Sequence, residues 1–239
     1  MKKRLLCAAL FLSMLIFYAG ETRAESFVDK ILRITGISAN TGQQRPSGDV
    51  KEGDIWIISL PDKSKRSLTS VGGYRSPVFS SGDKEVLALQ GEDIVQIPVS
   101  GGTVSPLYSV KGIMKLVGVD RTDPQRLLFI AEDDDGRALA GLITMTDGRI
   151  SYLPHDGRSR DDRRMISNLK GWGRTVGDKT IYVETETKSG MAGHIEWTDV
   201  KLKQGGKLPR NLSRCDGVAC GQPSISHDGG LVVFIRQGR

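Results

Sequence analysis

The sequence has 239 residues, a formal net charge of +6 and three cysteines. The first 24 residues contain four basic residues and one acidic residue (Lys2, Lys3, Arg4, Arg23 and Glu21). Without that segment the net charge is +3. An excess this small excludes the strongly basic surface of a nucleic-acid-binding protein, so no nucleic-acid partner is expected. The apolar runs are short, and no amphipathic stretch of helical period exceeds about a dozen residues, which predicts an all-β chain.

The N-terminus has the pattern of a secretory signal peptide. Basic residues at 2–4 precede an apolar run from Leu5 to Ala19, and Ala24 supplies the small residue at which a signal peptidase cleaves. The run has about 15 residues, fewer than the ~20 that cross a bilayer. We therefore expect residues 1–24 to be removed, a periplasmic or secreted location, and no stable membrane span afterwards. The alternative is a signal that is retained as an anchor.

Residues 25–50 are expected to form a leader or linker, in which Ile31–Ile37 contains a short alternating strand pattern. Residues 51–239 are expected to form one repeat domain, with short strands at hairpin spacing. The predicted strands include Asp54–Leu60, Arg66–Thr69, Asp93–Ile97, Thr103–Tyr108, Ile113–Val119, Leu127–Ala131, Leu139–Met145, Arg149–Leu153, Thr180–Thr185, His194–Val200, Pro209–Ser213 and Leu231–Ile235.

Two stretches 146 residues apart repeat the same order of residues. In each, a Leu-Thr or Leu-Ser pair is followed by a loop, a proline (Pro77 or Pro223), a polar turn and an apolar run. Such repetition predicts stacked copies of one supersecondary unit. Unit starts near residues 77, 113, 166 and 223 predict a β-propeller-like domain of four blades, or five if Ile31–Ile37 adds its own strand. The Asp54–Ser59 strand is expected to pair with Leu231–Ile235, because this pairing would close the ring.

The repeat resembles the WD-like propeller repeat of the periplasmic TolB family. The shared features are the Asp54-Ile55-Trp56 strand, Leu68-Thr69, a Gly-rich loop, and the turns Ser80-Ser81-Gly82-Asp83 and Ser226-His227-Asp228-Gly229. The shared residues are folding devices, so the resemblance implies a propeller fold and does not by itself indicate a function. The family carries an α/β domain before a six-bladed propeller, whereas about 25 residues precede the repeats here after the signal, so we expect a TolB-like propeller module.

Residue patterns for catalysis or metal binding are weak. The sequence has no Gly-x-Ser-x-Gly nucleophile elbow, and His155 and His227 fall in turns, where we interpret them as exposed residues. The segment Glu132–Gly136 favours a solvated hairpin tip, with a calcium loop as the alternative. We therefore predict no enzymatic activity, no metal and no cofactor. A pair of carboxylates from different blades, as in a glycan hydrolase, leaves no local pattern and stays an alternative.

Two cysteines remain once the signal is removed. Cys215 and Cys220 are separated by four residues in a loop, and in an exported chain this spacing favours a disulfide. A zinc site is the alternative, but two cysteines without neighbouring histidines form an incomplete ligand set.

The connections that lead into the inner strands carry the candidate binding residues. Tyr74 and Arg75 precede Pro77, and Trp172 and Arg174 open the last full unit. Tyr, Trp and Arg are enriched at binding hot spots, and these connections gather on one face of a propeller. We expect an exported, non-enzymatic propeller that binds a protein or peptide partner in the cell envelope. The alternatives are a periplasmic hydrolase or lyase that acts on a glycan or peptide, and a structural module of a larger assembly.

Overall fold

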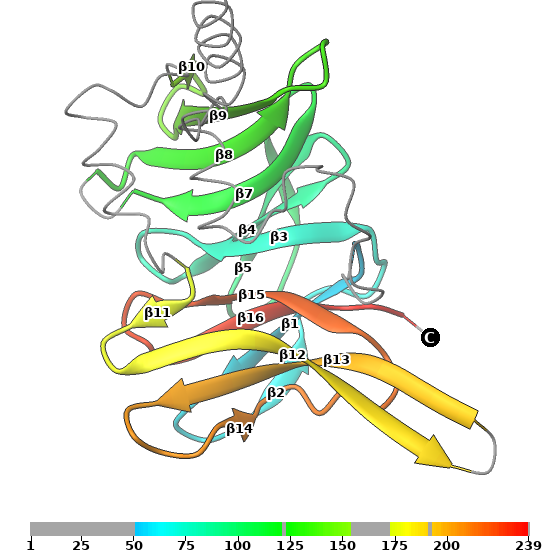
Figure 1. Ribbon diagram of the computed structural model, residues 1–239. Coiled ribbons are helices and arrows are strands. Elements are labelled where there is room, and N and C mark those ends of the chain that lie inside the picture. Colours follow the sequence, from blue (N-terminus) through cyan, green and yellow to red (C-terminus); the bar gives the residue numbers. More distant parts are fainter. Residues whose placement is uncertain (1–50, 121–122, 154–172, 191–192, 239) are drawn as a thin grey trace, which may run out of the picture.

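The computed structural model describes residues 51–120, 123–153, 173–190 and 193–238. Within these residues the chain forms sixteen β-strands in four antiparallel sheets of four strands each, and no helix (Figure 1). The all-β class is confirmed, and the number of sheets is the lower of the two predicted blade counts. The signal peptide, the strand expected within Ile31–Ile37 and the unit start near residue 166 lie outside the described residues.

The sheets follow one another as repeated four-stranded units. The first contains β3 (Tyr74–Phe79), β4 (Glu85–Gln90), β5 (Asp93–Pro98) and β6 (Ser105–Ser109). The second contains β7 (Ile113–Val119), β8 (Arg126–Glu132), β9 (Ala138–Thr144) and β10 (Ile150–Tyr152). The third contains β11 (Thr175–Val176), β12 (Lys179–Gly190), β13 (Gly193–Gln204) and β14 (Arg210–Asn211). The fourth contains β15 (Cys220–Ile225), β16 (Leu231–Arg236), β1 (Asp54–Ser59) and β2 (Lys65–Ser67).

The fourth sheet joins the first and last strands of the described chain. Strand β1 pairs with β16 along its whole length, from Asp54 opposite Arg236 to Ser59 opposite Leu231. The predicted pairing of these two segments is confirmed. This sheet lies between the first and the third, and it packs against both through buried apolar side chains.

Two apolar runs are buried on both faces because each lies between two neighbouring sheets. In β4, Val86 and Ala88 point into the core shared with the fourth sheet, whereas Leu87 and Leu89 point into the core shared with the second sheet. Strand β16 alternates in the same way between its two neighbours. A continuous apolar run is the expected sequence of a strand covered on both sides. These runs are the last parts of the two repeated stretches.

The repetition extends to an irregularity of the backbone. Strands β3 and β15 each have a bulge that contains the repeat's proline, between Arg75 and Val78 and between Gly221 and Ser224. A proline cannot donate to the ladder and is tolerated at such bulges. The preceding residues, Ser76 and Gln222, both adopt positive φ, at 52° and 51°. The prolines thus mark the points at which two inner strands leave the regular ladder.

The β12–β13 hairpin is longer than the sequence pattern predicted. Its two strands have twelve residues each and pair without a register shift from Lys179–Gln204 to Gly190–Gly193. The predicted strand Thr180–Thr185 missed the outer end of β12, because residues 186–190 are polar or glycine and show no apolar alternation. The predicted strand His194–Val200 covered the outer half of β13 and stopped four residues before its inner end at Gln204.

Candidate partner-binding site

A recess lies where β3, β7, β15 and the segment just before β11 approach one another. Residues 76–78, 115–117, 173–174 and 222–224 line it, so every sheet contributes to the wall. About 430 Å³ of space lies between these residues when the adjoining open solvent is counted, so the recess is an open one. A second, smaller open recess lies farther along the inner strands and is lined in part by Phe79, Ile225 and His227. Of the predicted inner-strand connections, only the one at residues 173–174 supplies described residues to the wall of the first recess, and the other lining residues belong to β3, β7 and β15.

A hydrogen bond between Ser76 and Gln222, called the clip below, joins the two bulges at the wall of the recess. The backbone N–H of Ser76 donates to Oε1 of Gln222, and Nε2 of Gln222 donates to the carbonyl of Lys51 at 3.1 Å. A non-glycine residue at positive φ costs roughly 1 kcal/mol or more and persists only where its surroundings fix it, often at ligand sites. The clip between Ser76 and Gln222 holds both strained residues, and it gives the recess a fixed wall.

Basic side chains gather at this recess. Lys115 and Arg174 line it, and Arg75 lies next to the lining residue Ser76. The Arg75 guanidinium donates to the carbonyl of Ile113 at 2.8 Å and lies 3.6 Å from the Glu52 carboxylate. The described residues that line the recess include no carboxylate. The wall of the recess therefore contains basic, hydroxyl and amide side chains.

The structure separates the four predicted binding residues. Arg174 lies in the recess wall and Arg75 beside it, with 20% of the Arg75 side chain exposed. Tyr74 is 2% exposed and packs in the core between the first and fourth sheets. Burial and the nearby Asp54 raise the pKa of its hydroxyl, which keeps this group neutral. Tyr74 thus supports the site from behind, and Trp172 lies outside the described residues.

The predicted disulfide between Cys215 and Cys220 is present in the structure. The two Cα atoms are 6.3 Å apart, within the usual range, and both residues are at most 2% exposed. The loop that it closes ends at Cys220, where β15 begins, two residues before Gln222. The disulfide therefore fixes the entry of the strand that carries one side of the clip.

A buried carboxylate fixes the start of the same loop. Asp199 in β13 accepts hydrogen bonds from Ser213 Oγ at 2.6 Å, Cys215 N at 2.7 Å, Asn211 Nδ2 at 2.9 Å and Trp197 Nε1 at 3.0 Å. Asp54 in β1 has an equivalent role, because its carboxylate accepts from Thr69 and from Gly72 N. The Asp and Ser/Thr positions of the repeat are thus anchors for the connections that lead to the inner strands.

His227 has a partner that the sequence analysis missed. Its Nδ1 lies 2.7 Å from Oδ1 of Asp83, and Oδ2 of Asp83 accepts from the N–H of Asp228. Asp83 has φ 54° and takes the place that Gly229 holds, at φ 68°, in the other repeated turn. The inverted order Gly82-Asp83 therefore places a carboxylate against the neighbouring sheet. The sequence shows this difference, because the first repeated turn has Asp83 at the position where the second has Gly229.

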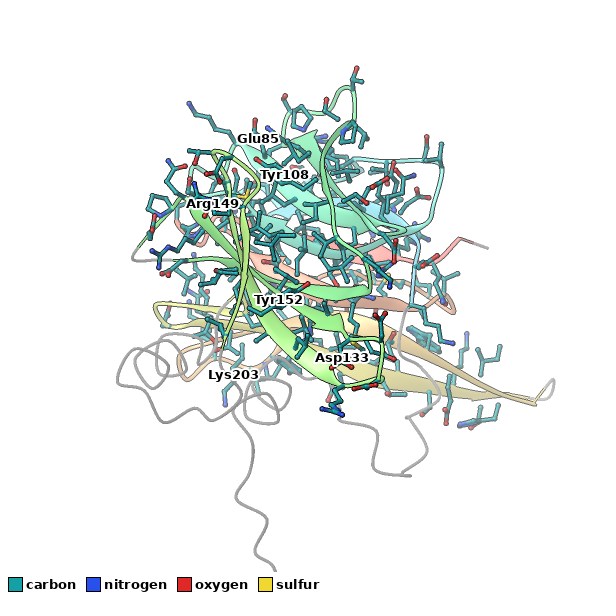
Figure 2. All side chains as sticks on the ribbon, turned by 90° about the horizontal axis from the view of Figure 1, so that it is seen from above. Glu85, Tyr108, Asp133, Arg149, Tyr152 and Lys203 are labelled. Carbon is teal, nitrogen blue, oxygen red and sulfur yellow. A yellow bond between two sulfur atoms is a disulfide. The ribbon has the colours of Figure 1, made fainter. Side chains whose placement is uncertain are left out.

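The candidate calcium loop at Glu132–Gly136 has an ordinary structural role. In the turn between β8 and β9, Oδ1 of Asp133 accepts from the N–H groups of Asp135 and Arg137, as in a hairpin tip (Figure 2). No group of three or more His, Cys, Asp or Glu side chains suited to a metal occurs within the described ranges. His155 lies outside those ranges. In the same part of the chain, no helix is long and apolar enough to cross a membrane.

Comparison with known proteins gives matches among solved structures alone. No protein-family model and no curated protein sequence matches the chain. A putative TolB from Agrobacterium tumefaciens has 13% identity and a TM-score of 0.37, over 76% of this chain and 60% of that one. TolB from Acinetobacter baumannii has 17% identity and a TM-score of 0.37, over 81% and 51%.

An acylaminoacyl peptidase from Pyrococcus horikoshii has 15% identity and a TM-score of 0.35, over 73% of this chain and 29% of that one. The chain thus spans about half the length of the TolB structures that it resembles. The TolB structures resemble this chain in fold, as the repeat in the sequence indicated. At these levels of similarity the resemblance concerns the fold alone, and the fold assignment rests on the order of the strands in the four sheets.

Proposed function

We propose that the chain is an exported β-propeller module that binds a protein or peptide partner in the cell envelope through the first recess. The observation that carries the proposal is the convergence of all four inner-strand regions on one solvent-open recess with Lys115 and Arg174 in its wall. The signal-like N-terminus and the Cys215–Cys220 disulfide support an oxidising compartment. The absence of carboxylates among the described lining residues favours binding over hydrolysis of a glycan.

The rigidity of the recess supports a binding role. The bulges at Ser76 and Gln222, the clip between them and the disulfide before β15 all restrict the wall before any ligand arrives. A wall that is already ordered loses little conformational entropy on association, so more of the interaction energy is kept as affinity. Arg174 adds a planar group with several donors, of the type that hot spots favour.

The experiment is capture of a cross-linked partner from envelope extracts, followed by titration of the purified partner. Replacing Arg174 with Ala is expected to weaken binding about tenfold or more, since a hot-spot arginine contributes more than about 1.4 kcal/mol. Arg149→Ala is the matched control, because that side chain is 81% exposed on the β9–β10 turn, outside the recess (Figure 2). Equal binding by both variants, with unchanged melting temperatures, would contradict the assignment of the recess.

Export is tested separately. If residues 1–24 are removed on export, mass spectrometry of the protein from the envelope fraction should find an N-terminus at Glu25. A protein that keeps Met1 and stays with the membrane would instead support the retained anchor.

A further inference from the structure

The β12–β13 hairpin extends well beyond the sheet to which it belongs. The corresponding hairpins have strands of six residues (β4 and β5) and seven residues (β8 and β9), whereas β12 and β13 have twelve each. Side chains from Val183 to Ser189 and from Gly193 to Glu196 are mostly exposed. Figure 1 shows the outer half, in yellow and gold, projecting away from the other strands. A two-stranded ribbon is marginally stable in water, so this extension gains from further pairing.

One edge of the ribbon carries a row of backbone groups without a strand partner among the described strands. Strand β11 pairs with β12 at Lys179 and Thr180, and the N–H of Ile181 donates outward to the carbonyl of Arg174. In an antiparallel ladder, alternate residues direct both backbone groups to the same side. The N–H and C=O groups of Val183, Thr185, Thr187 and Ser189 therefore point to the outer edge.

This edge lacks three features that usually prevent edge pairing. Native edges are often short, interrupted by proline or distorted by a bulge. The segment Ile181–Ser189 has no proline or glycine, and its register with β13 is regular. Its β-branched residues alternate with Glu184, Glu186 and Lys188, so the charges along the edge decide which strand fits beside it.

We propose that the outer edge of β12 pairs antiparallel with the same edge of a second copy of the chain, with Thr187 opposite Thr187 of the second copy. A two-fold axis through Thr187 places Glu186 opposite Lys188 of the second copy, and the reverse, giving two opposite-charge pairs. A two-fold axis through Thr185 would instead place Glu184 opposite Glu186 twice. An axis through Glu186 or Lys188 would place that charge opposite its own copy. Among these registers, only the one through Thr187 has opposite-charge pairs without a like-charge pair.

The two glutamates are already held on the face of the ribbon that this register uses. Glu184 and Glu186 both contact Lys201 of β13. The hydrogen bonds to Glu184 and Glu186 hold the pKa of Lys201 above its ordinary value. One lysine therefore serves two carboxylates within the chain, which leaves local negative charge for Lys188 of the second copy. The product is a four-stranded sheet in the order β13, β12, β12 and β13.

The first test is the oligomeric state of the full chain, measured by sedimentation equilibrium. About six backbone hydrogen bonds and two charge pairs predict a weak dimer, with a Kd of about 1–100 μM. Glu186→Lys and Lys188→Glu each create like-charge pairs and are expected to raise the Kd at least about tenfold. An equimolar mixture of the two variants restores both charge pairs and should form a heterodimer. The mixture controls for changes within each ribbon, because those changes persist in it.

The second test fixes the register by a disulfide. Residues in a hydrogen-bonded antiparallel pair have Cα atoms about 5.5 Å apart, which a disulfide can span. Thr187→Cys should therefore give a covalent dimer on oxidation. In the same register the two Thr185 residues are about 14 Å apart, so Thr185→Cys should not cross-link.

Three outcomes would overturn the proposal. They are a wild-type chain that stays monomeric up to about 0.5 mM, a dimer that the charge variants leave unchanged, and equal cross-linking at positions 185 and 187. Unaltered melting temperatures of the variants would show that the body of the protein remains folded in each case. The result does not depend on whether the recess binds a partner.

Discussion

At the scale of single residues, the buried Asp199 carboxylate is held by four hydrogen bonds. Each of its two oxygens accepts two hydrogen bonds, and the residue is 2% exposed. Burial alone would raise the pKa of Asp199, but the hydrogen bonds from Ser213, Asn211, Cys215 and Trp197 outweigh it and lower the pKa. The charged form is therefore the one that the fold requires.

Asp199→Asn is expected to lower the free energy of unfolding by about 2–3 kcal/mol, measured by urea denaturation at pH 7. The amide turns a donor toward groups that are themselves donors, and it removes the charge that strengthens the remaining bonds. Asp178→Asn, in an exposed turn, is the control and should change stability by less than about 0.5 kcal/mol.

The same pair of proteins has a defined pH dependence. A lowered pKa in the folded state means that the charge of Asp199 stabilises the fold above the unfolded pKa of about 3.9, and that this stabilisation is lost as the pH falls through the folded value. The stability difference between wild type and Asp199→Asn should therefore be constant above about pH 5 and shrink below about pH 4. A difference that instead grew on acidification would contradict this account of Asp199.

At the scale of elements, the position of β15 depends on the loop that precedes it as well as on its pairing with β16. The loop closed by Cys215–Cys220 carries positive φ at Asp216, as does Arg214 just before it, and the loop leads into β15. A short loop held by a disulfide and by Asp199 has few alternative conformations. The element that this loop positions is the one that carries Gln222 and the wall of the recess.

Replacing both Cys215 and Cys220 with Ser should lower the free energy of unfolding by about 2 kcal/mol, the low end of the usual range, because the closed loop is small. Partner binding at the recess should weaken as well, since β15 loses its fixed entry. Full partner affinity in the double variant would show that the loop does not shape the recess.

At the scale of the whole molecule, the sheet that contains β1 is completed by β16. The six residue pairs between these strands join segments from opposite ends of the described chain. Val233 and Ile235 of β16 also fill the core against the first sheet, and Val232 and Phe234 fill the core against the third. One strand therefore supports two interfaces between sheets.

Deleting residues 231–239 should abolish cooperative unfolding, because it removes β16 from the middle of its sheet and opens both adjacent cores. Deleting residues 238–239 is the control, since β16 ends at Arg236, and it should keep the wild-type melting temperature. Thermal unfolding followed by circular dichroism distinguishes the two results. A sharp transition in the longer deletion would contradict the central role of β16.

The fold was largely predictable because it is repetitive. The Pro77 and Pro223 stretches and the Asp54 strand carry local patterns, and these led to the all-β class, the four units and the β1–β16 pairing. The unit that begins near residue 113 was placed by strand order, and its first strand begins at Ile113. Anchors such as Asp199 recur with the repeat, although their hydrogen-bond partners could not be read from it.

The candidate site was less predictable, since it depends on contacts between distant segments. The sequence placed Tyr74 and Arg75 together in one connection, but alternation along β3 sends Tyr74 into a core and leaves Arg75 near the recess. The clip between Ser76 and Gln222 and the contact between Asp83 and His227 each join residues about 145 positions apart. Such contacts follow from how two sheets meet, and no local pattern encodes that geometry.

The joining of β1 to β16 also sets the timing of folding. During synthesis the N-terminal strand must wait, with one ladder edge open, until the final residues of the sheet have left the ribosome. Contacts of such long range form slowly. The fourth sheet, and the two cores that it shares with its neighbours, therefore cannot be completed before β16 has been synthesised.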